Sequence, residues 1–175
     1  MSQPSATDPD WTRETPRKWW DPGRRLLRCI RDYQALEGRP AARLRRPLVV
    51  LRHRFWSMVS QADIPLTTRI GGGLMLPHPN GVVIHPGVTI GPNGIIFQQV
   101  TLGSNAPKPG VPVIGGHVDI GPGARLLGPV TVGDHAVIGA NAVVLQDVPP
   151  GATAVGVPAR ILPARILPAH PDQED

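Results

Sequence analysis

The chain has 175 residues, a formal net charge of +5 at pH 7, and 41% hydrophobic but only 4% aromatic residues. This length allows one main domain with a buried core and a smaller appendage. A single cysteine, Cys29, excludes an intrachain disulfide and favours a reducing compartment. The polar start of the sequence lacks the apolar core of a signal peptide, and no apolar run has the length of a membrane span. We expect a cytoplasmic protein with no membrane partner.

The positive charge is concentrated in the segment 1–69. This segment carries 14 of the 18 lysines and arginines and 7 of the 13 acidic residues, a local balance of +7, whereas the remainder has a balance of −2. A basic segment of this kind can serve nucleic-acid binding. It contains no zinc-finger, homeodomain or stacking-aromatic motif, so we expect no nucleic-acid partner.

Two segments precede the main pattern. Residues 1–23 are rich in Pro, Asp, Ser and Thr, which predicts a flexible lead whose three tryptophans dock onto the body or onto a neighbouring subunit. Residues 24–61 are predicted to be a short helical segment, with one helix over 24–36 and a second over 41–59 that Pro47 kinks or splits. The second helix has apolar residues along one side, so its arginines are expected on the opposite, solvated face. These apolar residues are Leu44, Leu48, Leu51, Phe55 and Val59.

An apolar residue then recurs at every sixth position, with one interruption at Lys108. The members of this series are Ile84, Ile90, Ile96, Leu102, Ile114, Ile120, Leu126, Val132, Ile138 and Val144. Neither a helix, with a period of 3.6, nor an alternating strand, with a period of 2, keeps a strict six over this length. A short strand followed by a turn does, and a hexapeptide period is the sequence signature of a parallel β-helix. Three hexads close one triangular coil, so residues 104–110 around the interruption are predicted to loop out of it.

A glycine follows most members of the series. These glycines are Gly91, Gly103, Gly115, Gly121, Gly133 and Gly139. Glycine at this place suits a corner that needs a positive φ, or one where two backbones approach closely. Another small or branched apolar residue lies two positions before most members. We therefore expect a mostly β chain in which small apolar side chains fill narrow coils.

The repeat begins near residue 62 in a different phase. A first series also runs in steps of six, through Ile64, Ile70, Leu76 and Val82. It is two residues out of phase with the later series, and the shift falls just after residues 77–81. Altered corners in a regular scaffold are where functional sites are usually built. The β-helix domain is predicted over 62–158, followed by a tail over 159–175.

His78, at this altered corner, is the leading candidate for catalysis. It lies between two prolines, which stiffen its backbone. A neutral imidazole can take the proton of a hydroxyl while that oxygen attacks a thioester carbonyl, which needs neither a covalent nucleophile nor a metal. The residues alone leave open a second interpretation, in which His78 is a corner residue bonded to the backbone.

Several motifs of the chain resemble those of serine O-acetyltransferases, within the hexapeptide acyltransferase superfamily. They are IGGGLMLPHPNGVV (70–83), QQVTLG (98–103), IGANAVVLQDVPP (138–150) and AVGVPARI (154–161). The resemblance covers residues 62–162. It implies a left-handed parallel β-helix, assembly as a homotrimer around the β-helix sides that can pair into a dimer of trimers, acetyl-CoA as co-substrate and a role in cysteine biosynthesis.

The resemblance also implies roles for two residues. In that family a histidine at the place of His78 is the general base, and an aspartate fifteen residues earlier, here Asp63, is paired with it. A carboxylate on the far ring nitrogen fixes the tautomer and stabilises the imidazolium that forms during transfer. The acceptor side of the site is expected to include Pro77, Asn80 and His117, the last approaching from a neighbouring subunit.

For acetyl-CoA, the resemblance implies a groove along the coils between adjacent subunits. The matching positions are Gly103, Ala124, Ala140 and Ala142, where small side chains let backbone amides reach the pantetheine arm. Arg160, or Arg165 in the tail, is expected near the CoA phosphates. No Cys/His cluster has the spacing of a zinc site, and no metal is expected.

The chain departs from the family pattern where the acceptor binds. The family has an aspartate directly before its histidine, where this chain has Pro77, and an Arg-His pair where this chain has Gly110 and Val111. Acetyl-CoA use therefore carries over better than serine specificity. The hypothesis is an acetyl-CoA-dependent O-acetyltransferase acting on serine or a serine-like small molecule. A sugar or polysaccharide-pathway O- or N-acetyltransferase and a non-catalytic hexapeptide scaffold are the alternatives.

Overall fold

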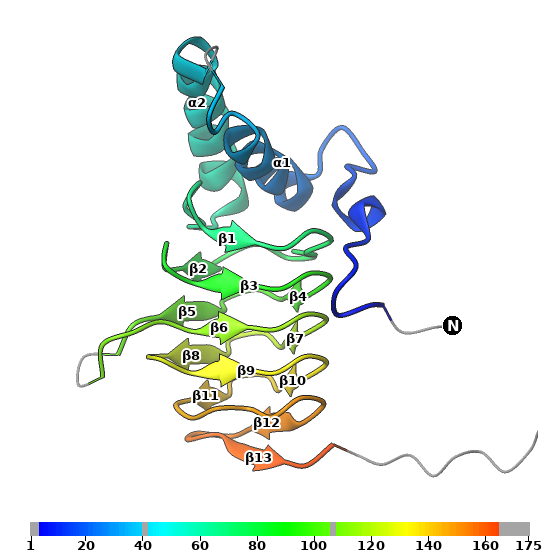
Figure 1. Ribbon diagram of the computed structural model, residues 1–175, viewed down its shortest axis with the longest axis vertical. Helices are drawn as coiled ribbons and strands as arrows, with labels where there is room; N and C mark the ends of the chain where they lie inside the picture. The colour runs from blue at the N-terminus through cyan, green and yellow to red at the C-terminus, as the bar shows by residue number, and fades with distance from the viewer. Residues whose placement is uncertain (1–3, 40–41, 106–107, 165–175) are drawn as a thin grey trace, which may run out of the picture.

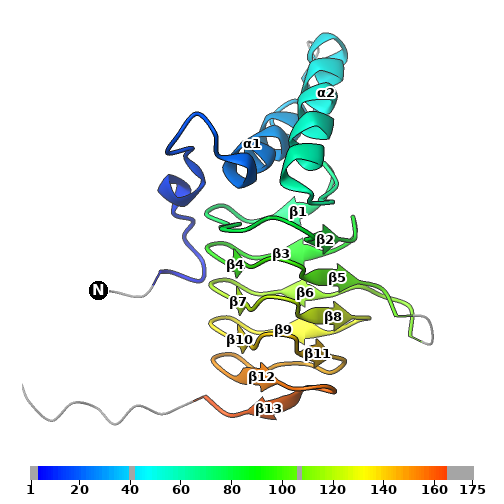
Figure 2. The same cartoon turned by 180° about the vertical axis from the view of Figure 1, so that it is seen from behind.

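The computed structural model describes residues 4–39, 42–105 and 108–164. Two helices lie at one end of a stack of short strands, and the strands form the three faces of a triangular prism (Figure 1). Seen from behind, the same stack shows the chain passing from face to face as it descends (Figure 2). No helix among the described residues is long and apolar enough to cross a membrane.

Each face of the prism is one sheet, and all neighbouring strands are parallel except β12 and β13. The first sheet contains β1 (Arg69–Ile70), β3 (Thr89–Ile90), β6 (Val113–Ile114) and β9 (Thr131–Val132). The second contains β4 (Ile95–Ile96), β7 (Asp119–Ile120), β10 (Val137–Ile138), β12 (Thr153–Val155) and β13 (Arg160–Leu162). The third contains β2 (Val83–Ile84), β5 (Thr101–Gly103), β8 (Arg125–Leu127) and β11 (Val143–Val144). The predicted parallel β-helix is confirmed.

The strand register explains both irregularities of the repeat. Val83 pairs with Thr101, three hexads further along the chain, which is one regular coil. Thr101 pairs with Arg125, four hexads further along, because this coil contains the predicted loop as a fourth hexad. In the first coil Arg69 pairs with Thr89, which lies two positions beyond the third hexad, so two extra residues are inserted there. Met75 still pairs with Ile95 at the same spacing, which places the insertion between Met75 and Val83, at the corner of His78.

The apolar series forms the core. Every member from Ile84 to Val144, and every member of the earlier series from Ile64 to Val82, is at most 7% exposed. The small residues two positions before them, such as Ala124 and Ala142, are fully buried as well. Such a stack must be closed at its ends, because each coil buries its apolar face only against its neighbours.

The first helix closes the upper end. α1 (Pro22–Gln34) begins with Asp21 as N-cap and a proline in its first turn, a favoured helix start. Its residues Leu26, Leu27 and Ile30 are almost fully buried and belong to the same core cluster as the first coil. Cys29 is also buried, and burial raises the pKa of its thiol, so this cysteine is a packed thiol and not a reactive one.

The second helix, α2 (Ala42–Ser60), is continuous through Pro47 and exposes its apolar side. Its buried residues are Ala42, Val49 and Ser60, not the predicted stripe. The apolar side and several of the arginines, Arg43, Arg45 and Arg54, are thus both exposed in the single chain, because the helix packs on α1 through a different side. The exposed large apolar residues of α2 are Leu44, Leu48, Leu51, Phe55 and Met58.

The described part of the lead runs along one edge of the prism beside the turns that precede β4 and β7 (Figure 1). The buried Asn93 holds it: its side-chain oxygen accepts from the amide of Asp10, and its nitrogen donates to the carbonyls of Ser5 and Asp8. Within η1 (Trp11–Glu14), Glu14 is buried and forms an ion pair of 2.7 Å with Arg31 of α1. The lead, predicted as flexible, is thus bonded to both the helix and the coils.

Candidate active site

The C-terminal end of α2 is connected to the first coil by a tight helix cap. The amide of Gln61 donates to the carbonyl of Met58, and the amide of Ala62 donates to that of Ser57. Gln61 itself has a φ of 53°. This pair of bonds around a left-handed residue is a Schellman motif, usually built on glycine. It places Asp63 directly below the last turn of the helix.

Asp63 lies on the third sheet, where it extends the ladder above β2. Its amide donates to the carbonyl of Val82, and its carbonyl accepts from the amide of Ile84, so its backbone is fixed. Ile64 points into the core, and by the alternation of a strand the Asp63 side chain points outward and is exposed. The carboxylate therefore faces the space between helix and sheet.

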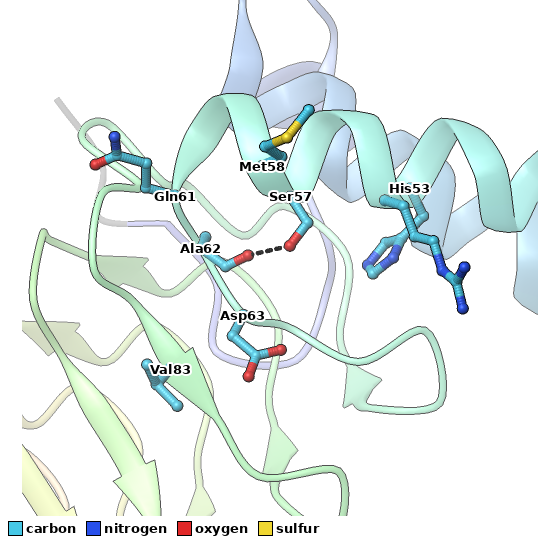
Figure 3. Close-up of a pocket in the computed structure, with 8 residues that line it drawn as sticks. His53, Ser57, Met58, Gln61, Ala62, Asp63 and Val83 are labelled. Carbon is cyan, nitrogen blue, oxygen red and sulfur yellow. Dashed lines mark hydrogen bonds between the residues drawn. The ribbon is translucent and has the colours of Figure 1, made fainter.

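This space is a hollow of about 540 Å³ (Figure 3). It is lined by His53, Arg54, Ser57, Met58, Gln61, Ala62, Asp63 and Val83. Figure 3 shows His53 and Ser57 projecting from α2 toward the strand that carries Asp63, with the Ser57 hydroxyl bonded to the Ala62 carbonyl. Nε2 of His53 lies 2.8 Å from the carbonyl oxygen of Ile64. Because a carbonyl oxygen only accepts, Nε2 carries a hydrogen, and in the neutral ring Nδ1 is free to accept.

His78 and Asn80 lie on the corner that leads into the same sheet. Both side chains are exposed, as is Pro77. The Asn80 side-chain amide donates to the side-chain oxygen of Gln61, and the Gly81 amide donates to the Gln61 carbonyl. The two-residue insertion therefore brings the His78 corner beneath the segment that carries Asp63. Fifteen residues apart in sequence, the two lie on adjacent coils of one edge.

His117 lies on a different edge of the prism, between the first and second sheets. Its Nδ1 is 2.8 Å from Nδ1 of His135, one coil below, so one nitrogen donates and the other accepts. Burial lowers the pKa of His117, and the nearby carboxylate of Asp119 opposes that shift. Within one chain this histidine does not join the His78 corner.

The residues expected to hold CoA divide into two groups. Ala124 and Ala142 are fully buried, and their carbonyls accept from the amides of Thr101 and Arg125 within the ladder. Gly103, Ala140 and Arg160 lie at the surface. A Cβ at Gly103 would meet no atom closer than 3.8 Å, so the space beside this backbone is open to a ligand. Arg165 lies outside the described residues.

Sequence reasoning overlooked His53 and Arg54. Both belong to an arginine-rich helix, and no local pattern distinguishes a residue that faces a neighbouring coil from one that faces solvent. Their separation in sequence from the C-terminal cap of α2 could have identified them. Gln61 ends the helix, so residues one and two turns earlier lie above the first coil. In the described part of the chain, no group of three or more His, Cys, Asp or Glu side chains is placed to hold a metal ion.

Comparison with known proteins agrees with the hexapeptide fold. The family model "Bacterial transferase hexapeptide (six repeats)" matches residues 112–146. The serine acetyltransferase of Helicobacter pylori strain J99 is 41% identical over 143 residues, which is 81% of this chain and 81% of that protein. The chain belongs to the serine acetyltransferase family. Its β-helix is accordingly left-handed.

Longer members of the serine acetyltransferase family match over the same region. The serine acetyltransferase of Escherichia coli strain K12 is 44% identical over 120 residues, which is 67% of this chain and 44% of that protein. A solved serine acetyltransferase in complex with CoA superposes with a TM-score of 0.70 at 35% identity, over 82% of this chain and 58% of that one. The chain thus spans less than half the length of several curated relatives that it matches.

Proposed function

We propose that this chain transfers an acetyl group from acetyl-CoA to the hydroxyl of L-serine or a serine-like small molecule. The observation that carries the proposal is the edge formed by Asp63 and His78, beside a hollow, in a chain 41% identical to a serine acetyltransferase over most of its length. One solved relative is a serine acetyltransferase in complex with CoA, which supports the choice of co-substrate.

His78 acts as the general base in this proposal. Its imidazole takes the proton of the acceptor hydroxyl while the oxygen attacks the thioester carbonyl. The C–S bond then breaks, and the CoA thiolate takes the proton back from the imidazolium. Asp63 stabilises that imidazolium and orients the ring. Both side chains are exposed in the single chain, where an acceptor can reach them.

Two features of the exposed surface suit acetyl-CoA as the co-substrate. The backbone at Gly103 borders open space, and the exposed guanidinium of Arg160 suits a phosphate group. Acetyl-CoA supplies the activated acyl group, and the chain supplies a binding surface and the base.

Assembly as a homotrimer belongs to the same proposal. The apolar stripe of α2 is unusual for a surface that faces solvent, because each of its residues is 47% exposed or more. The stripe consists of Leu44, Leu48, Leu51, Phe55 and Met58. Contiguous exposed apolar patches mark interaction sites. A second copy that covers this stripe would also border the hollow, because Met58 belongs to both.

The test is the rate of CoA thiol release from acetyl-CoA with L-serine, in the unchanged chain and in His78→Ala. The matched control is His85→Ala, since His85 is also an exposed corner histidine but lies at the other end of β2, with its Nδ1 accepting from the Gly87 amide. We expect a loss of about 10²–10⁴-fold in His78→Ala, the usual contribution of a general base, and an unchanged rate in His85→Ala. Equal rates in all three proteins would contradict the role of His78. No release with serine, but release with another hydroxyl acceptor, would move the assignment to that acceptor.

A further inference from the structure

Two histidines meet at the edge of the prism between the first and second sheets. His117 lies in the turn that joins β6 to β7, and His135 lies one coil below, in the turn that joins β9 to β10 (Figure 1). Their Nδ1 atoms are 2.8 Å apart, and their ring centroids are 5.0 Å apart. His135 is exposed and His117 is half-buried, so a solute can reach the pair. Within one chain, neither of them lies at the corner of His78.

The backbone of the two turns holds the rings in this arrangement. Both histidines are in the left-handed region, with φ of 51° at His117 and 60° at His135, and Asn93 in the turn above has a φ of 62°. The His117 amide donates to the Pro92 carbonyl at 2.7 Å, and the His135 amide donates to the Gly116 carbonyl at 2.9 Å. Equivalent side chains of such turns lie one coil apart, about 4.8 Å. The two imidazoles are therefore neighbours because of the stacking of the coils.

Two carboxylates make this edge favourable for a cation. Asp119 lies two residues after the upper histidine, and one of its carboxylate oxygens is buried with no hydrogen-bond partner among the described residues. Asp134 directly precedes the lower histidine and is exposed. Arg13 of the lead is a cation near the pair, and its guanidinium donates to the Asn93 carbonyl at 2.6 Å.

We propose that His117 and His135 together bind one divalent transition-metal ion of the Ni²⁺, Cu²⁺ and Zn²⁺ group, through their two Nδ1 atoms. Imidazole nitrogen is a favoured ligand of these metals, whereas Mg²⁺ and Ca²⁺ take oxygen ligands. Two nitrogens that each lie about 2.0–2.1 Å from one ion are about 2.9 Å apart at a right angle and about 3.3 Å apart at the tetrahedral angle. The observed 2.8 Å is close to the right-angle value, which is the arrangement in square-planar Cu²⁺ and Ni²⁺ sites.

Binding requires a change of tautomer and little movement. In the neutral pair, Nδ1 of one ring carries a hydrogen and Nδ1 of the other accepts it. When that hydrogen moves to Nε2 of its own ring, both Nδ1 atoms present a lone pair to the ion. Water fills the remaining positions, because the described residues supply two ligands. Acetyl transfer with a histidine base needs no metal, so the role of this ion is to link two consecutive coils.

Calorimetric titration of the full chain, without an affinity tag, with Ni²⁺, Zn²⁺ and Mg²⁺ tests the site. His117→Asn and His135→Asn each remove one ligand, and asparagine suits their left-handed backbone, as Asn93 shows. The matched control is His85→Asn, because His85 is an exposed corner histidine whose Nδ1 accepts from the Gly87 amide at 3.1 Å.

We expect one Ni²⁺ or Zn²⁺ ion per chain and no binding of Mg²⁺. His117→Asn and His135→Asn each weaken Ni²⁺ binding by about 10–100-fold, which is what loss of even an outer-shell partner costs in known metal sites. His85→Asn leaves the affinity unchanged. Equal binding by all four proteins, a loss in only one of the two ligand variants, or no Ni²⁺ or Zn²⁺ binding by the full chain would overturn the proposal.

Urea unfolding with and without Ni²⁺ distinguishes a lost ligand from a lost fold. An ion that binds only the folded chain stabilises it, so Ni²⁺ should raise the urea midpoint of the full chain and of His85→Asn. The midpoints of His117→Asn and His135→Asn should match that of the full chain without metal and should not rise with Ni²⁺. An equal rise in all four proteins would contradict the site.

Discussion

Replacing Gly91 by alanine tests why the repeat requires a glycine after its apolar residues. A Cβ at Gly91 would lie 2.5 Å from the carbonyl carbon of Gly115 and 2.6 Å from its oxygen. Gly91 does not have a positive φ, so turn conformation is not its constraint. Both contact atoms belong to the main chain of the next coil, and neither can move without moving that coil.

The expected cost follows from this geometry. Carbon atoms in non-bonded contact lie about 3.5–4.0 Å apart, so the two coils must separate by about 1 Å at this corner. That movement strains the 2.8 Å hydrogen bond from the Gly91 amide to the Ile114 carbonyl. Overpacking costs about 1–3 kcal/mol and a lost hydrogen bond about 1 kcal/mol, against about 0.4–1 kcal/mol gained by restricting the unfolded chain. We expect Gly91→Ala to lower the free energy of unfolding by about 1–3 kcal/mol.

Gly103→Ala is the matched control. It occupies the same place after an apolar residue and also lacks a positive φ, but the nearest atoms to its Cβ would be Thr101 Cγ2 at 3.8 Å and Leu127 Cδ2 at 3.9 Å. We expect no loss, or a gain of up to about 1 kcal/mol. The assay is urea unfolding followed by circular dichroism at one fixed protein concentration, since assembly shifts apparent stability. Equal effects of the two substitutions would refute the argument from stacked backbones.

Three further substitutions test other parts of the structure. Phe55→Glu places a charge within the exposed stripe of α2 and should convert the proposed trimer to monomer in light scattering, whereas an unchanged mass would show that the stripe is not the interface. Arg31→Met leaves the buried carboxylate of Glu14 unpaired and should cost about 3–5 kcal/mol in urea unfolding, more than Glu14→Gln. Burial raises the pKa of Asp119, so the folded chain binds more protons than the unfolded one, and its stability falls as pH rises from 3.8 through the folded pKa. Asp119→Asn should remove that loss, so its stability relative to the unchanged chain should increase between pH 4 and pH 7; a constant difference would contradict the shift.

The coils could be predicted because their determinants are local. A hexad of fixed pattern makes one strand and one corner, so the buried series from Ile84 to Val144 follows from the sequence by counting. The two-residue phase shift before Ile84 likewise predicted an altered corner, and the strand pairing shows that this corner contains a two-residue insertion. The sequence did not show whether the glycines are needed for a positive φ or for close approach of two backbones, because close approach depends on how the coils stack.

The contacts between segments could not be predicted in this way. The Asp10 amide bonds to Asn93, 83 residues away, and no period links the two. The apolar side of α2 was visible in the sequence, but periodicity does not reveal whether the same chain covers that side. The position of His53 and Arg54 beside the hollow could not be predicted either. It depends on the helix cap at Gln61, which is in the left-handed region although it is not glycine.

The position of the candidate site follows from the change of element at the top of the stack. Coils of a β-helix lie about 4.8 Å apart, the spacing of hydrogen-bonded strands, so outward side chains of one coil are flanked closely by those of the next. Asp63 has a coil below it, at Val83, but a helix above it. Helices pack at about 8–10 Å, and that wider spacing leaves room between α2 and the first coil for polar side chains and a ligand. A carboxylate at the equivalent place one coil lower would have strands on both sides and no hollow. The two-residue insertion puts the corner of His78 next to the segment that carries Asp63, so the proposed base lies on the coil just below this space.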